Sequence, residues 1–295
     1  MHSPDASVRD YIQLHLVVLS WGLTAILGKL IELPPVDLTI WRTLLAAVGF
    51  VMLAVLLKVP LRLPKREALA LLGVGALIGW HWTLFFLSAR LSTASVTLAA
   101  MPTLMVFCSV MEPLVDGKRK WRVSELVAGF IICCAVWLIY QVEFRYWLGF
   151  SVALASVLFA AVFAVANKHL AVRYHFSVSM SWQMTGGLVA CVLLRPIVSD
   201  DFAIAIPEGR DWLWLILLSM VCTVAAYAGY ADLLRRMSVF TVNVAYNLEP
   251  VYGVILAAAV FGQSERMSPG FYAGASIILA SVLALPFWNR SHARN

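Results

Sequence analysis

The chain has 295 residues, of which 62% are hydrophobic and only 13% charged, and its formal net charge is +6. A soluble domain of this length keeps about a quarter of its residues charged, so this composition excludes an ordinary water-soluble fold. The positive charges lie mostly in short segments between apolar runs, a distribution that argues against a nucleic-acid-binding surface.

Ten long apolar stretches follow one another along the chain. About 20 helical residues cross a hydrocarbon core of ~30 Å, so each stretch is long enough to span a membrane. Only helices and closed barrels satisfy their backbone groups in lipid, and runs such as 131–139 lack the period-two alternation of a barrel strand. We therefore predict an all-α polytopic membrane protein. The predicted spans are residues 12–31, 38–57, 67–89, 92–114, 123–141, 146–166, 177–194, 211–234, 238–261 and 268–288.

Basic residues are distributed unequally between the two sets of connecting segments. The segments on the side of the N-terminus hold 15 of the 22 Lys and Arg residues, and those on the other side hold 5. Lys29 and Arg42 lie within spans. Because short cytoplasmic loops carry the excess of positive charge, we expect both termini in the cytoplasm and the chain in the inner (plasma) membrane.

The second half of the chain repeats features of the first half in the same order. Since five spans make an odd number, the second copy enters the membrane from the opposite side, which is a 5+5 inverted repeat. We place the first repeat at residues 1–145 and the second at 146–295. The matched segments are 28–30 with 167–170, 40–43 with 181–184, 89–92 with 235–238, and 127–129 with 272–274.

The first span carries Trp21-Gly22 and Lys29, and the ninth carries Leu248-Glu249-Pro250. Together with the five plus five spans, these residues resemble the EamA-type family of the drug/metabolite transporter superfamily, over about residues 12–288. The resemblance implies a ten-helix inner-membrane carrier of small metabolites, with a central cavity lined by helices from both halves. It implies no particular substrate.

Glu249 is the acid of an otherwise uncharged run from Val239 to Phe261. A charge at the bilayer centre costs roughly 2.5–3.5 kcal/mol on insertion scales, so such residues usually face a cavity or a partner. Pro250 removes a backbone donor and should kink the helix beside the carboxylate. We interpret Glu249 as a binding or coupling site on a hinged helix, with a structural carboxylate as the alternative. Aligning Ser92 with Ser238 places Thr103 opposite Glu249, so the acid has no counterpart in the first repeat.

Several other polar residues within spans are candidates for substrate binding. Asn243, Tyr246 and Asn247 make the ninth span too polar to face lipid, although bonds between helices would also explain them. For Arg42 and Lys29 we favour side chains that snorkel to the outer surface. If Arg42 instead points inward, it is the natural partner of Glu249 or of an anionic substrate. The remaining candidates are His81 and Trp82 in the third span, Tyr227 and Tyr230 in the eighth, and Ser20 and Thr24 in the first.

For these candidates, packing is the alternative to cavity lining. His81 suits proton transfer or a neutral bond to a neighbouring helix, and we leave both open. For Ser20 and Thr24 we favour neither close packing nor a place in the cavity. Asp232 lies beside Arg235 and Arg236, where we expect an ion pair at the membrane surface.

The leading functional hypothesis is a secondary transporter that moves a small amino-acid-like or amphipathic compound by alternating access, with export favoured. The GxxxxGK[ST] phosphate-binding motif does not occur, so we expect no ATP-driven step and no cofactor. The alternatives are an intramembrane enzyme, for which no catalytic motif is present, and a passive channel. The expected partners are the small-molecule substrate and the lipid bilayer, without nucleic acid. Proton coupling, metabolite exchange and a homodimer stay open.

Overall fold

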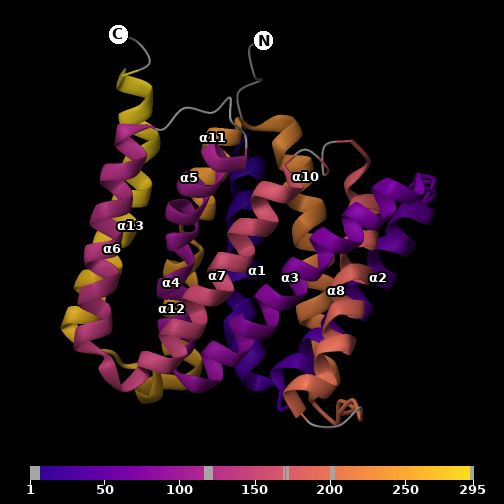
Figure 1. The fold of residues 1–295 in the computed structure, drawn as a ribbon, viewed down its shortest axis with the longest axis horizontal. Coiled ribbons are helices and arrows are strands. Elements are labelled where there is room, and N and C mark those ends of the chain that lie inside the picture. Colours follow the sequence, from indigo (N-terminus) through magenta and orange to yellow (C-terminus); the bar gives the residue numbers. More distant parts are fainter. Residues whose placement is uncertain (1–6, 116–121, 169, 171–172, 200–202, 293–295) are drawn as a thin grey trace.

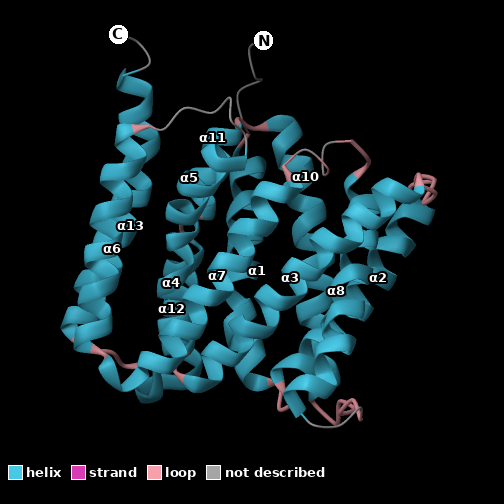
Figure 2. Ribbon diagram, viewed as in Figure 1, coloured by secondary structure: helices cyan, strands magenta, loops and turns pink. Residues whose placement is uncertain are grey.

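The computed structural model describes residues 7–115, 122–168, 170, 173–199 and 203–292, leaving aside the side chains of residues 239, 240, 243 and 285–292. Within these ranges the chain forms helices joined by short connections, without a strand (Figure 2). The helices run roughly along one direction, and both termini lie at the same end of the molecule (Figure 1). We call this the termini end and the other end the far end.

The first half of the chain contains five membrane-length segments. Ser7 begins the first of them with a capping box, in which its hydroxyl accepts from Asp10 N while Asp10 accepts from Ser7 N. The fourth segment is broken at a 3₁₀ turn, Met101–Thr103. The helices are α1 (Val8–Leu30), α2 (Pro35–Leu56), α3 (Lys65–Leu91), α4 (Ala94–Ala100), α5 (Leu104–Val115) and α6 (Val123–Val142).

The second half has the same plan, with breaks in its third and fourth segments. A π-helical stretch, Leu217–Ala225, joins α9 to α10, and two turn residues separate α11 from α12. The helices are α7 (Trp147–Asn167), α8 (Phe176–Ser199), α9 (Asp211–Ile216), α10 (Ala226–Arg236), α11 (Val239–Tyr246), α12 (Glu249–Phe261) and α13 (Pro269–His292).

In the described part of the chain, 9 segments are long and apolar enough to cross a membrane. The tenth predicted span corresponds to α13, whose apolar part covers Pro269–Ala284. The all-helical membrane architecture predicted from hydropathy is therefore confirmed. Many leucine, valine and isoleucine side chains of these helices are exposed, as expected for surfaces that face lipid rather than water.

Two helix pairs relate the halves to each other. α2 packs against α8, and α6 packs against α13, so each of these helices contacts its own counterpart in the other repeat. Two tryptophans follow the same symmetry. Trp41 Nε1 of α2 donates to Ala205 O in the connection before α9 (2.9 Å), and Trp182 Nε1 of α8 donates to Leu61 O in the connection before α3 (3.2 Å). These mirrored contacts at opposite ends of the molecule fit an inverted repeat.

In each half, the fourth of the five membrane-length segments is interrupted, and a proline lies at or next to the interruption. Pro102 lies in the turn between α4 and α5, and Pro250 occupies the first turn of α12. Proline lacks a backbone donor and crowds the preceding turn, so it is tolerated at a helix start but not inside a helix. The kink expected at Pro250 is a full interruption at residues 247–248. Its counterpart at Met101–Thr103 was not expected.

Candidate functional site

Arg42 of α2 points into the molecule, and the expectation that it snorkels to the surface is wrong. Its side chain is buried, with 2% of the residue exposed. The guanidinium carbon lies 3.6 Å from the ring centroid of Trp82 and 5.6 Å from that of Phe86, both in α3. Stacking on aromatic faces stabilises a weakly hydrated guanidinium in an apolar interior. Trp82, a predicted site residue, thus supports Arg42 from the same half of the chain.

Thr223 holds the guanidinium from the second half. Arg42 donates to Thr223 Oγ1 from Nε (3.2 Å) and from Nη2 (3.1 Å), and Thr223 Oγ1 donates to Leu218 O (2.9 Å). Leu218 precedes Thr223 by five residues, the spacing of the π-helical stretch. Single π turns are frequent at functional sites because they redirect a side chain. In the described part of the chain no hydrogen bond involves Nη1 of Arg42, so both of its N–H groups remain for another group.

A group of aromatic rings surrounds Trp21 of α1. The ring centroid of Trp21 lies 5.7 Å from Tyr227, 5.5 Å from Tyr230 and 5.2 Å from Tyr246. Tyr227 and Tyr230 come from α10 and Tyr246 from α11, so both halves contribute. The four side chains are only partly buried. We call these four residues the Trp21 group.

Glu249 adjoins the Trp21 group at the first residue of α12. The Tyr246 side chain lies close to its carboxylate. Arg42 and Tyr227 lie within electrostatic range of the same carboxylate, although the described ion pairs do not include one between Arg42 and Glu249. A carboxylate in the first turn of a helix is favoured by the helix dipole. The arrangement therefore combines a cation from the first half with an anion from the second, beside aromatic rings.

Of the remaining predicted site residues, His81, Ser20 and Thr24 make hydrogen bonds that do not involve Arg42 or Glu249. The His81 ring contacts Ser156 of α7 through Nδ1, with Ser156 O at 2.9 Å and Ser156 Oγ at 2.8 Å, so it joins α3 to α7. Ser20 and Thr24 donate to carbonyls of their own helix, Val17 O and Trp21 O. Asn247 lies in the turn before Glu249, and the side chain of Asn243 is outside the described part. A substrate-binding role for these residues stays a prediction.

Lys29 is paired rather than extended to the surface, which corrects the second snorkelling expectation. Its Nζ lies 2.8 Å from Glu265 Oε1. Glu265 is a buried acid that the sequence analysis missed, and the two residues are 236 positions apart. The sequence does show Lys29 at the end of the first span and Glu265 just beyond the ninth, but no local pattern predicts that the two are paired. The surface ion pair expected for Asp232 and Arg236 is present.

Two segments of the chain match the model of the EamA-like transporter family, residues 10–141 and 147–287. The chain belongs to the EamA-like transporter family. It is thus a membrane transporter of the drug/metabolite transporter superfamily, and the two matches fit its 5+5 arrangement.

Other comparisons support the fold of this EamA-like transporter. A solved structure described as "Crystal structure of protein" superposes with a TM-score of 0.64, covering 95% of this chain and 98% of that chain at 17% sequence identity. At this identity the likeness concerns the fold alone. No curated protein matches the chain well enough to count as a relative.

Proposed function

We propose that this EamA-like transporter binds a small zwitterionic, amino-acid-like compound between its two halves and moves it by alternating access. The observation that carries the proposal is the placement of Arg42 and Glu249. One charge comes from each half, and the two lie within electrostatic range beside the Trp21 group. Inverted-repeat transporters bind substrates at the repeat interface, typically where helices are interrupted.

Each charge has a complementary group on a zwitterion. Arg42 is held by Trp82 and Thr223 with Nη1 left to donate, which suits a substrate carboxylate. Glu249 and the tyrosine faces of the Trp21 group suit an ammonium, through charge and through cation–π contact. A substrate side chain of apolar character would lie against the aromatic rings.

Alternating access follows from the repeat. Two copies of one fold in opposite orientations can exchange their packings, which opens the central site to one side and then to the other. We infer export from the cytoplasm, with both termini cytoplasmic as the basic residues favour. Glu249 is an intramembrane carboxylate, so its protonation is the natural means of proton coupling, and exchange of two metabolites is the alternative.

The test is thermal stabilisation of the purified protein by three matched probes: phenylalanine, phenylalaninamide and N-acetylphenylalanine. A ligand at about 100 times its dissociation constant stabilises the folded state by about 2.7 kcal/mol, which is readily measured. We expect phenylalanine to stabilise the wild type more than either derivative. Glu249→Gln should lose the difference between phenylalanine and its N-acetyl derivative, and Arg42→Gln the difference between phenylalanine and its amide.

The substitution Arg42→Gln is chosen because the repeat places Gln183 at the equivalent position of α8. Two outcomes contradict the proposed substrate class. In one, none of the probes stabilises the wild type. In the other, both variants respond to all three probes as the wild type does.

A further inference from the structure

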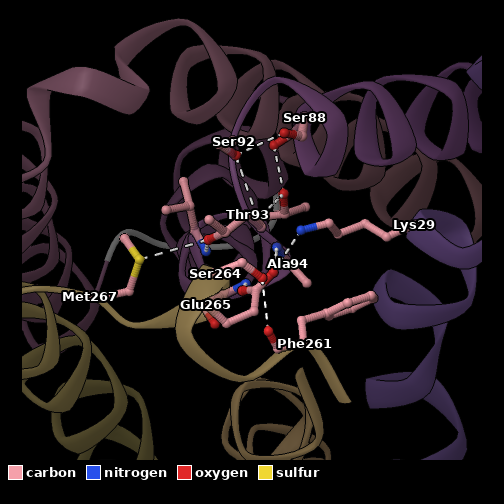
Figure 3. Close-up of polar contacts among 12 residues, drawn as sticks. Lys29, Ser88, Ser92, Thr93, Ala94, Phe261, Ser264, Glu265 and Met267 are labelled. Carbon is pink, nitrogen blue, oxygen red and sulfur yellow. Dashed lines mark hydrogen bonds and ion pairs between the residues drawn. The ribbon is translucent and has the colours of Figure 1, made fainter. Parts of the chain in front are cut away.

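Contacts of Glu265 join the two halves at the far end of the molecule, and we call this set of contacts the far-end closure (Figure 3). The Glu265 carboxylate accepts hydrogen bonds from Lys29 Nζ (2.8 Å) and Ala94 N (3.0 Å) at Oε1, and from Ser95 N (2.9 Å) at Oε2. Glu265 is 1% exposed. Three charge-assisted bonds in a buried setting are among the stronger polar contacts that a protein makes. They connect α1 and α4 of the first half to the 3₁₀ turn Gly262–Glu265 that follows α12 in the second.

Neighbouring residues complete this closure. Lys29 Nζ lies 4.7 Å from the ring centroid of Phe261, the last residue of α12. Thr93 caps α4 by accepting from Val96 N (3.1 Å), and its hydroxyl approaches the Met267 sulfur at 3.8 Å. The chain segment that carries Glu265 is thus held on both sides by residues of the first half.

Between this closure and Glu249, α12 packs tightly on α1 and α4. A Cβ atom added at Gly253 would lie 2.4 Å from Leu98 Cδ1 and 3.0 Å from Gly22 O. One added at Gly22 would lie 3.0 Å from Gly253 N. Glycine at both positions therefore permits a backbone-to-backbone approach that seals the far half of the interface.

The other end of α12 adjoins the interruption at residues 247–248. A helix that follows such an interruption can rotate as a rigid element, because the turn residues absorb the change in backbone angles. Motion of α12 about this turn would displace the 3₁₀ turn Gly262–Glu265 that directly follows it, and would carry Glu265 away from Lys29 and α4. Glu249, in its first turn, would connect that motion to the central site.

We propose that Lys29, Glu265 and the backbone N–H groups of Ala94 and Ser95 form a latch that keeps the far end closed and opens when α12 pivots about residues 247–248. The inference rests on the proposed alternating access, since a latch matters only if the far end opens. It concerns the closing of the pathway and not the chemistry of the substrate.

The test is the labelling rate of a buried reporter, Leu98→Cys, by a maleimide in purified protein whose five native cysteines have been replaced. Leu98 belongs to α4 and is fully buried against Gly253 of α12, so its labelling measures the population in which the far end is open. We expect Glu265→Gln to raise the rate about tenfold and Lys29→Met about threefold, because Lys29→Met leaves the two backbone bonds of Glu265 in place. Lys29→Arg should keep the rate of the parent protein.

Two controls separate latch opening from general loosening. Glu143 is another buried acid beyond a helix end, accepting from Ser268 N (2.7 Å) and from Arg145 Nε (3.1 Å), but it joins α6 to α13 instead. Glu143→Gln should leave the labelling of Leu98→Cys unchanged. Ile132→Cys, a buried reporter in α6, should not label faster when the Glu265→Gln change is added.

The proposal is overturned if Glu265→Gln does not raise the labelling of Leu98→Cys, or if it raises that of Ile132→Cys equally. It is also overturned if Glu143→Gln has the same effect on Leu98→Cys as Glu265→Gln. Because labelling needs no substrate, these outcomes are independent of the thermal stabilisation by phenylalanine. Failure of the latch can therefore be distinguished from failure of the proposed function.

Discussion

The two ends of the molecule carry related lysine–glutamate pairs with different geometry. At the far end, Lys29 and Glu265 approach to 2.8 Å, with side-chain exposures of 20% and 0%. At the termini end, Lys168 and Glu112 lie 3.6 Å apart, with exposures of 43% and 22%. Lys29 lies in the last turn of α1, and Lys168 directly follows α7, the equivalent helix of the second repeat. The first pair is tight and buried, and the second is loose and partly exposed.

The surroundings differ in the same sense. Glu265 also accepts two backbone N–H groups, whereas Glu112 lines a cavity of about 120 Å³ bounded by α5, α6 and α13. Under the proposed alternating access, the two ends of the inverted repeat exchange their packings between states. The comparison therefore describes a state in which the far end is closed and the termini end is more loosely packed.

Replacing Glu265 should lower the free energy of unfolding much more than replacing Glu112, and this is the largest difference that we expect between the two ends. Breaking a buried pair by removing one partner costs 3–5 kcal/mol, whereas an exposed pair contributes about 0–1 kcal/mol. We expect Glu265→Gln to lower the free energy of unfolding by about 3 kcal/mol, because glutamine keeps one acceptor for the N–H groups of α4 but no charge for Lys29. Glu112→Gln should change it by less than about 1 kcal/mol.

Thermal melting of the purified variants measures this difference, with Glu143→Gln as a second buried acid for reference. If Glu265→Gln and Glu112→Gln lowered the free energy of unfolding equally, the two pairs would be energetically equivalent, which would contradict the difference described above.

Adding a methyl group to a glycine tests the packing of the closed end. Gly253→Ala places its Cβ within 2.4 Å of Leu98 Cδ1, and overpacking of this kind costs about 1–3 kcal/mol. Gly129→Ala in α6 meets its nearest atom at 3.5 Å, an ordinary contact, so it should be neutral or slightly stabilising. A Gly253→Ala protein that melts at the temperature of Gly129→Ala would show that α12 is not tightly held.

Replacing Trp41 and Trp182, the two symmetry-related tryptophans, should give the smallest difference in stability between paired variants. Trp41→Phe and Trp182→Phe each remove one indole hydrogen bond to a carbonyl, worth about 1 kcal/mol, together with some packing. Because the two contacts are related by the repeat, the two losses should agree within about 0.5 kcal/mol, the usual scatter of such values. Melting curves in which only one substitution is destabilising would contradict a symmetric role for α2 and α8.

Hydropathy was sufficient to predict the helices of this fold, because long apolar runs in lipid have few alternatives. The repeat could also be predicted, since segments such as 40–43 and 181–184 keep their order. Pro250 predicted a kink beside Glu249, where the structure has a full interruption of the helix. The break at Met101–Thr103 was missed, although Pro102 lies within it, because an apolar run around one proline does not distinguish a kink from an interruption.

The direction of the charged side chains could not be predicted in the same way. Arg42 lies near a span end, where snorkelling and burial suit the same sequence position. Its burial depends on Trp82 and on Thr223, which is 181 residues away. Glu265 likewise owes its role to Lys29 and to the amides of α4, contacts that arise only when the halves pack together. Periodicity carries no information about such pairings.

Counterflow in proteoliposomes is the decisive measurement of transport through a site shared by Arg42 and Glu249. Vesicles loaded with unlabelled phenylalanine would be diluted into a trace of the labelled compound. We predict transient, saturable accumulation with the wild type, and its loss with Arg42→Gln and with Glu249→Gln. Absence of accumulation in the wild type, non-saturable entry as through a pore, or unchanged counterflow in both variants would contradict the account.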